Sequence, residues 1–170
     1  MNPLEQTVLV LAYGNPGRRD DGLGPTLAAA LAALDLPGVT IDMDYQLTVE
    51  DAAAVAAHDV VVFVDADCHG AEPFSFTELT PEAVVSFSSH SVAPQAVLGL
   101  AAELFGAVRP GYLLGIRGYE FNEFGEGLSE RARANLAAAL EFIEPLLRTR
   151  TFSAGVADAA LAAATPLGDD

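Results

Sequence analysis

Short apolar runs alternate along the chain with longer segments whose apolar residues recur at helical spacing. The apolar runs are rich in β-branched and aromatic residues, and they predict strands at residues 7–13, 39–47, 59–66, 73–79 and 111–121. The run at 59–66, DVVVFVDA, is the strongest and is predicted to lie at the centre of the sheet. The run at 73–79 alternates and predicts an edge strand.

The helical pattern occurs at residues 25–34, 48–58, 91–105 and 129–148. Thr48, with Asp51 three residues later, resembles a capping arrangement. Pro94 fits only in a first helical turn, and Ser129 is a predicted N-cap. Strands that alternate with helices predict an α/β sandwich with a mostly parallel sheet and right-handed crossovers.

At 170 residues the chain is long enough for one domain with a substantial core, which we expect over residues 1–150. Residues 151–170 are small and low in complexity, so we expect a mobile C-terminal tail. No apolar run approaches the roughly 18 residues that cross a bilayer, and no signal-peptide pattern is present. The single cysteine, Cys68, cannot form an internal disulfide. We therefore expect a soluble, cytoplasmic protein without a membrane partner.

The formal net charge is −16, and all eight basic residues are arginines. The absence of lysine excludes a P-loop lysine, a Schiff base and a lysine general base. The acidity also argues against a nucleic-acid partner, because binding to the phosphate backbone depends on basic side chains. A metal cation or a basic protein segment is the more natural partner.

In open α/β sheets, sites form outside the carboxyl ends of the strands. The polar residues that follow the first three predicted strands, or precede the third helix, are Asn15, Asp20, Asp21, Asp42, Asp44, Asp65, Asp67, Cys68, His69 and His90. Their order in the chain predicts a cluster of carboxylates with one imidazole at a single edge of the sheet.

The loop at 14–24 carries two adjacent aspartates at the mouth of a helix. A nucleotide loop is disfavoured because Gly14 and Gly17 are spaced G-x-x-G, no GK[ST] follows, and the aspartates would repel an anion. The simplest interpretation is that Asp20 or Asp21 caps the following helix. One aspartate can also cap while the other points into the cleft.

Alternatives remain open for the later candidates. Asp65 and Asp67 can both be turn formers at the end of a strand. Asp65 lies within an apolar run, however, so its carboxylate can instead be paired with a cation. Cys68 and His69 could form a metal pair or a nucleophile with its base, although adjacent residues of an extended chain point apart. His58 fits an ordinary surface histidine.

His90 lies between two serines, which suggests a Ser-His-Asp triad with Asp65. No G-x-S-x-G element holds a serine, so a mixed nitrogen and oxygen site for zinc, nickel, manganese or iron suits His90 better.

Four motifs occur in order: LVLAYGNPGRRDDGLGP, VVVFVDADCHG, SSHS and GIRGYEFNEFGEGLS. Together they resemble the hydrogenase maturation proteases over about residues 8–147. The resemblance implies an α/β fold, a three-layer sandwich in which a mostly parallel, twisted five-stranded sheet carries helices on both faces. It also implies an endopeptidase that removes the C-terminal extension of a [NiFe] hydrogenase large-subunit precursor after nickel insertion.

By the same resemblance, the metal ligands are Asp21 in DDGLG, Asp65 in VDA and His90 in SSHS. The nickel is supplied by the precursor, and the chain is expected to act as a monomer. The general base is not fixed, and the candidates are Asp44 and Asp20. The acidic residue that the family carries after its second strand matches best at Asp44, with Asp42 close by.

The chain departs from the family pattern at Tyr13, where a small or apolar residue is usual, at AEPF after the third strand, and at Cys68-His69 beside the site. Two other functions compete with the protease. One is a nickel-dependent binding protein or chaperone for the precursor that does not cleave it. The other is a small-molecule metallohydrolase, which predicts a deep apolar pocket.

Overall fold

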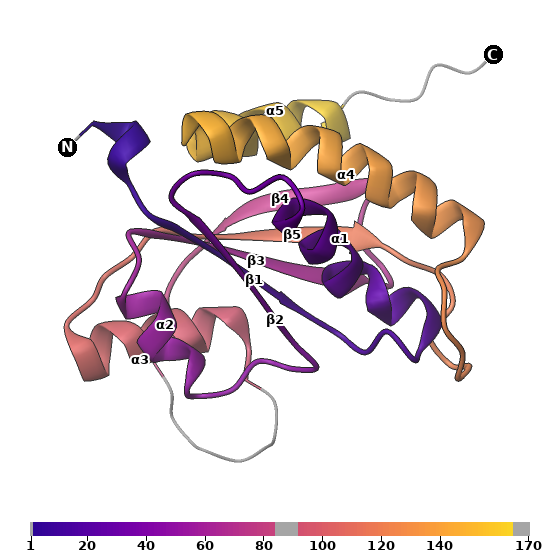
Figure 1. Ribbon diagram of the computed structural model, residues 1–170, viewed down its shortest axis with the longest axis horizontal. Coiled ribbons are helices and arrows are strands. Elements are labelled where there is room, and N and C mark those ends of the chain that lie inside the picture. Colours follow the sequence, from indigo (N-terminus) through magenta and orange to yellow (C-terminus); the bar gives the residue numbers. More distant parts are fainter. Residues whose placement is uncertain (1, 84–91, 165–170) are drawn as a thin grey trace.

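The computed structural model describes residues 2–83 and 92–164 of the chain. Its centre is a five-stranded sheet in the order β2-β1-β3-β5-β4 (Figure 1). The strands are β1 (Val8–Tyr13), β2 (Val39–Asp44), β3 (Val60–Asp67), β4 (Phe74–Leu79) and β5 (Gly111–Arg117). All neighbouring pairs are parallel except β4 with β5. The predictions of a mostly parallel sheet, a central β3 and an edge β4 are therefore confirmed.

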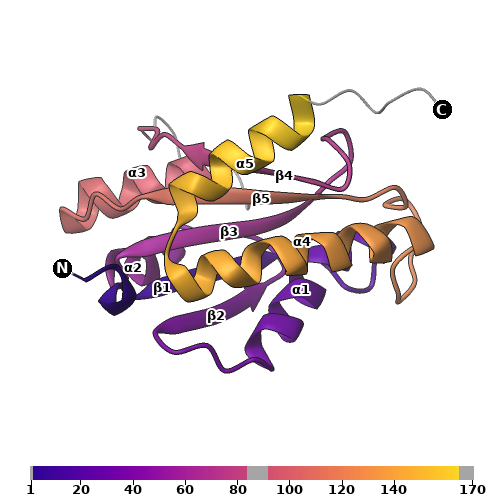
Figure 2. The same ribbon diagram turned by 90° about the horizontal axis from the view of Figure 1, so that it is seen from above.

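Helices cover both faces of the sheet, which confirms the three-layer sandwich (Figure 2). One face carries α1 (Leu23–Ala32), α4 (Glu130–Thr149) and α5 (Phe152–Ala164), and the other carries α2 (Asp51–Ala56) and α3 (Pro94–Phe105). Among the helices of the described residues, none combines the length and the hydropathy that a membrane crossing requires.

The period-two alternation of the strands divides the core into two clusters. Val10, Val62 and Leu114 pack beneath α1 and α4, whereas Leu11 and Phe63 pack against α2 and α3. The central strands are apolar at nearly every position because both of their faces are covered.

The predicted N-cap at Ser129 is confirmed, whereas α1, α2 and α3 begin at Leu23, Asp51 and Pro94, each two or three residues from the predicted starts at 25, 48 and 91. The Ser129 hydroxyl accepts a hydrogen bond from the Ala132 N–H at 3.3 Å, and Pro94 is the first residue of α3. The Thr48 N–H donates to the Asp51 carboxylate at 2.7 Å, which is one half of a capping box. Strands β2 and β5 end earlier than predicted, at Asp44 and Arg117, because the chain leaves the sheet there to build loops at its carboxyl edge.

The predicted tail is wrong for most of its length, because residues 152–164 form α5. Phe152 is buried, and its ring stacks on Tyr112 with the ring centroids 5.3 Å apart. Gly155 lets the helix approach α4, since a Cβ there would lie 2.3 Å from a Leu146 methyl group. The alanine-rich composition that indicated low complexity is also favourable to a helix once Phe152 anchors it.

Candidate functional site

Glycines bring the start of α1 directly against the strand ends. A Cβ at Gly24 would lie 2.6 Å from the Tyr13 carbonyl oxygen and 3.0 Å from that of Val64. Gly14 has a φ of 143°, and a Cβ there would lie 2.0 Å from the backbone oxygen of Asp21. The glycines of the GN and DDGLG motifs therefore allow the loop and helix to pack tightly over β1 and β3.

Asp20 is fully buried, and its carboxylate accepts four hydrogen bonds from a distant loop. The donors are the N–H groups of Tyr119 at 2.8 Å, Glu120 at 3.0 Å and Ser129 at 2.7 Å, together with the Ser129 hydroxyl at 2.7 Å. Burial alone would raise the pKa of Asp20, but these hydrogen bonds outweigh it and hold the pKa below its usual value. Asp20 is therefore an anchor for the loop after β5.

Backbone hydrogen bonds join the same two loops. The Arg19 N–H donates to the Gly125 carbonyl at 3.0 Å, and the Gly125 N–H donates to the Gly17 carbonyl at 2.8 Å. The Asp20 N–H donates to the Glu120 carbonyl at 2.9 Å. The first and last motifs of the sequence are therefore halves of one structural unit at the carboxyl edge of the sheet.

Asp21 points elsewhere. Its carboxylate accepts the Asn15 N–H at 2.8 Å, and it is half-buried. Neither Asp20 nor Asp21 caps α1, whose N-cap residue, Gly22, has no side-chain cap, so the helix-cap interpretation is wrong. The charge of Asp21 raises the pKa of Asp65, so the two carboxylates interact electrostatically.

Asp65 lies near the end of β3 and is largely buried. Its pKa is raised to about 7, chiefly by burial; the charges of Asp21 and Asp67 also raise the pKa, and a hydrogen bond from the Ala66 backbone opposes the rise. Hydrogen bonding from the Tyr13 hydroxyl lowers it. Asp65 is therefore a carboxyl group held close to the midpoint of its titration at neutral pH, not an ordinary turn former.

Tyr13 is a site residue whose role the sequence did not reveal. It follows Ala12, which pairs with Val64 in the parallel register, so Tyr13 and Asp65 are neighbours across β1 and β3. Burial and the adjacent carboxylate both raise the pKa of Tyr13, which keeps its hydroxyl protonated. The one sequence signal for this role is that Tyr13 stands where the family usually has a small or apolar residue.

The remaining polar residues after β3 have local roles. One oxygen of Asp67 accepts the N–H groups of His69 at 2.9 Å and Gly70 at 2.8 Å, which confirms Asp67 as a turn former. Cys68 and His69 are exposed. His58 contacts the Ala54 carbonyl oxygen through Nδ1 at 2.7 Å and therefore has a structural role at the end of α2.

His90 lies outside the described residues. Within residues 2–83 and 92–164, no group of three or more histidine, cysteine, aspartate or glutamate side chains is placed to hold a metal ion. Of the three residues that the motif resemblance implies as metal ligands, the described part of the chain contains Asp21 and Asp65.

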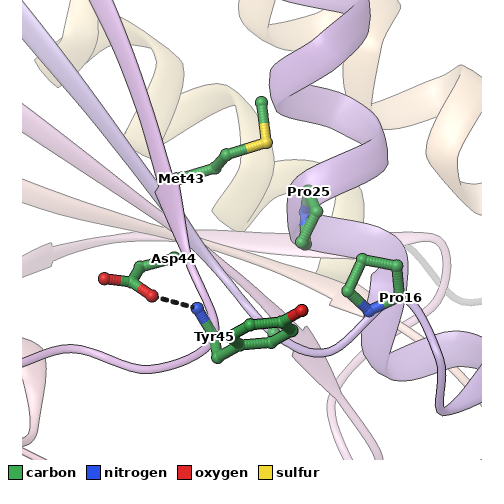
Figure 3. A pocket seen from close by; sticks show the side chains of 6 residues that line it. Pro16, Pro25, Met43, Asp44 and Tyr45 are labelled. Carbon is green, nitrogen blue, oxygen red and sulfur yellow. Dashed lines mark hydrogen bonds between the residues drawn. The ribbon is translucent and has the colours of Figure 1, made fainter.

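Asp42 and Asp44 lie at the exposed end of β2. Each accepts the N–H of the following residue, Met43 at 2.9 Å and Tyr45 at 2.7 Å. Burial, together with the charges of Asp42 and Asp44, raises the pKa of Asp51 at the start of α2. A pocket of about 230 Å³ opens beside this strand end (Figure 3), and its lining residues are Gly14, Pro16, Pro25, Met43, Asp44 and Tyr45.

No protein-family model and no curated protein matches the chain. Solved structures do match over most of its length. A [NiFe] hydrogenase maturation protease, HycI, from Thermococcus kodakarensis is 26% identical, with a TM-score of 0.65 over 84% of this chain and 93% of that one.

Two further structures share the fold at lower identity. The hydrogenase maturating endopeptidase HybD from E. coli is 21% identical, with a TM-score of 0.64 over 85% of this chain and 94% of that one. The hydrogenase 2 maturation peptidase of a Thaumarchaeota archaeon is 22% identical, with a TM-score of 0.62 over 85% and 99%. The resemblance indicated by the motifs is therefore confirmed, and the chain has the fold of the hydrogenase maturation proteases.

Proposed function

We propose that the chain is an endopeptidase that removes the C-terminal extension of a [NiFe] hydrogenase large-subunit precursor after nickel has been inserted. The observation that carries the proposal is the pair of carboxylates, Asp21 and Asp65, at the carboxyl edge of a fold shared with the Thermococcus kodakarensis protease. These are two of the three ligands that the motif resemblance implies, and His90 is the third.

In this proposal, nickel is part of the substrate and arrives in the precursor. Carboxylates and a neutral imidazole make a mixed oxygen and nitrogen ligand set that suits nickel. Asp65 must lose its proton to act as a ligand, and its pKa of about 7 makes that loss inexpensive near neutral pH. An incomplete ligand set leaves room for ligands that the precursor itself provides.

Binding of the precursor through its nickel would hold the peptide to be cut beside Asp21 and Asp65. The main catalytic contribution of the chain is then proximity, because the scissile peptide is positioned without a large binding surface. Nickel at this point would supply a Lewis acid that polarises a carbonyl group or activates water.

The two candidates for the general base, Asp20 and Asp44, differ in their surroundings. Both oxygens of Asp20 are engaged by the loop after β5 and are shielded from solvent, so Asp20 cannot reach a substrate. Asp44 is exposed and borders the pocket at the end of β2. We retain Asp44 as the candidate general base and assign Asp20 a structural role.

The pocket beside Asp44 is small. It holds about 230 Å³, below the roughly 300–1,000 Å³ of pockets that enclose drug-sized ligands. A site of this size fits one side chain of a polypeptide better than a whole small-molecule substrate.

The test is intact-mass analysis of the large-subunit precursor from the same genome, with and without nickel, after incubation with the protein. We expect loss of a C-terminal peptide only from the nickel-loaded precursor. Asp21→Asn should abolish this loss, whereas Asp158→Asn on the exposed side of α5 should not. Normal processing by Asp21→Asn would refute the ligand assignment, and a stable complex without any mass change would favour the non-catalytic binding protein.

A further inference from the structure

The pocket at the end of β2 has features of a specificity site. We propose that it receives one apolar side chain from the C-terminal extension of the precursor, and that a neighbouring residue of the extension is basic. This inference rests on the proposed function for the identity of the partner.

The pocket walls are apolar side chains that the fold leaves in solvent. Met43 is 47% exposed and Tyr45 is 69% exposed, although each lies at a strand end beside helix α1. Both side chains reach toward Pro25 and Pro16, so that the four residues form a concave apolar surface (Figure 3). A partner side chain in the pocket would remove this surface from water.

The carboxylates of the strand end lie on the other side of β2. Figure 3 shows the Asp44 carboxylate pointing away from the side chains of Met43 and Tyr45. Asp42, Asp44 and Asp51 line one small hollow beside the end of β2, so these three residues are close to one another. The ion pairs found within the described ranges, Arg131 with Glu72 and Arg148 with Glu144, do not include them.

This arrangement specifies the chemistry of the occupant. Successive side chains of an extended segment point to opposite sides. A segment that crosses the end of β2 can therefore place an apolar residue in the pocket while the adjacent residue faces Asp42, Asp44 and Asp51. Unpaired carboxylates of like charge favour a lysine or an arginine at that adjacent position.

The pocket also adjoins the carboxyl edge of the sheet, where the proposed nickel ligands lie. Gly14 lines the pocket, and its Cα lies against the backbone oxygen of Asp21. The next residue, Asn15, donates its N–H to the Asp21 carboxylate. The pocket therefore adjoins the loop that carries Asp21, which points to an occupant near the peptide bond that is cut.

The experiment measures the dissociation constant of the complex with the nickel-loaded precursor, and separately the kcat and KM for its cleavage. We expect Tyr45→Ala and Met43→Ala each to raise the dissociation constant and the KM about tenfold, with little change in kcat. Val108→Ala is the matched control, because Val108 is 75% exposed and lies just before β5, at the amino ends of the parallel strands and away from the pocket.

Alanine replacements in the extension then identify the occupant. One apolar residue should show energetic coupling to Tyr45→Ala, and one adjacent basic residue should show coupling to Asp42→Asn. Weaker binding by the pocket variants, in a protein that never cleaves the precursor, would retain this inference and overturn the proposed function. Unchanged binding by these variants would overturn the inference even if cleavage is observed, and so would the absence of a complex with the wild-type protein.

Discussion

The ionisation of Asp65 should make the protein less stable as the pH rises. Its pKa is about 7 in the folded protein against 3.8 for the unperturbed group, because burial and the charge of Asp21 disfavour the carboxylate. Between these two pH values the folded state binds more protons than the unfolded state. The contribution of Asp65 to the free energy of unfolding therefore falls from pH 4 to pH 7 and stays low above pH 7.

The size of this change in the free energy of unfolding follows from the difference between the two pKa values. At about 1.4 kcal/mol for each pH unit, the change from 3.8 to about 7 corresponds to an upper limit of about 4 kcal/mol. Asp65 is not fully buried, so solvent reduces the effect, and we expect at least about 1 kcal/mol. Asp65→Asn should remove this loss of stability with rising pH, because an amide cannot ionise. Its oxygen can still accept a hydrogen bond from the Tyr13 hydroxyl.

The assay is urea unfolding of the metal-free protein at several pH values from 4 to 8. We expect Asp65→Asn and the wild type to be similar near pH 4, with the variant more stable at pH 8. Asp158→Asn is the control for a change in net charge, since this residue is exposed on α5. Parallel pH profiles for Asp65→Asn and the wild type would refute the assignment of a raised pKa to Asp65.

Three further predictions concern the framework of the site. Asp20→Ala leaves the donors on Tyr119, Glu120 and Ser129 unpaired, and it should lower the free energy of unfolding by at least about 3 kcal/mol in urea titrations; an unchanged midpoint would contradict its anchoring role. Gly24→Ala should cost about 1–3 kcal/mol by the same assay, because the added Cβ meets backbone oxygens, and a neutral result would refute the close packing. Phe152→Ala should cost about 3–5 kcal/mol in thermal unfolding, and an unaltered melting temperature would show that α5 does not anchor the domain.

The sheet could be predicted because its signal is local. Each central strand is buried on both faces, so a continuous apolar run identifies it without knowledge of its neighbours. The order of the strands along the chain then places the ends of β1, β2 and β3 at one edge. This is why the carboxylates that follow these strands, Asp21 and Asp65 among them, could be predicted to lie at one edge.

The features that the sequence did not predict depend on contacts between distant segments. The hydrogen bonds of Asp20 reach about a hundred residues along the chain, from the loop after β1 to the loop after β5. Helix α5 is stabilised by the stacking of Phe152 on Tyr112, and small residues alone gave no sign of that contact. Tyr13 acts on Asp65 only through the register of two strands that are separated in the sequence.

The two adjacent aspartates show how one short motif can perform two tasks. Asp20 and Asp21 are the two middle residues of a single 3₁₀ turn, Arg19–Gly22, so their side chains leave the backbone in different directions. Asp20 turns inward to four donors, which lower its pKa, whereas Asp21 turns to Asn15 and to the space beside Asp65. Because the anchored loop fixes the turn, the position of Asp21 depends on Asp20. Under the proposed function, Asp20→Asn should therefore weaken cleavage through Asp21, and a higher concentration of the nickel-loaded precursor should restore part of the activity, whereas loss of a general base would lower kcat at every precursor concentration.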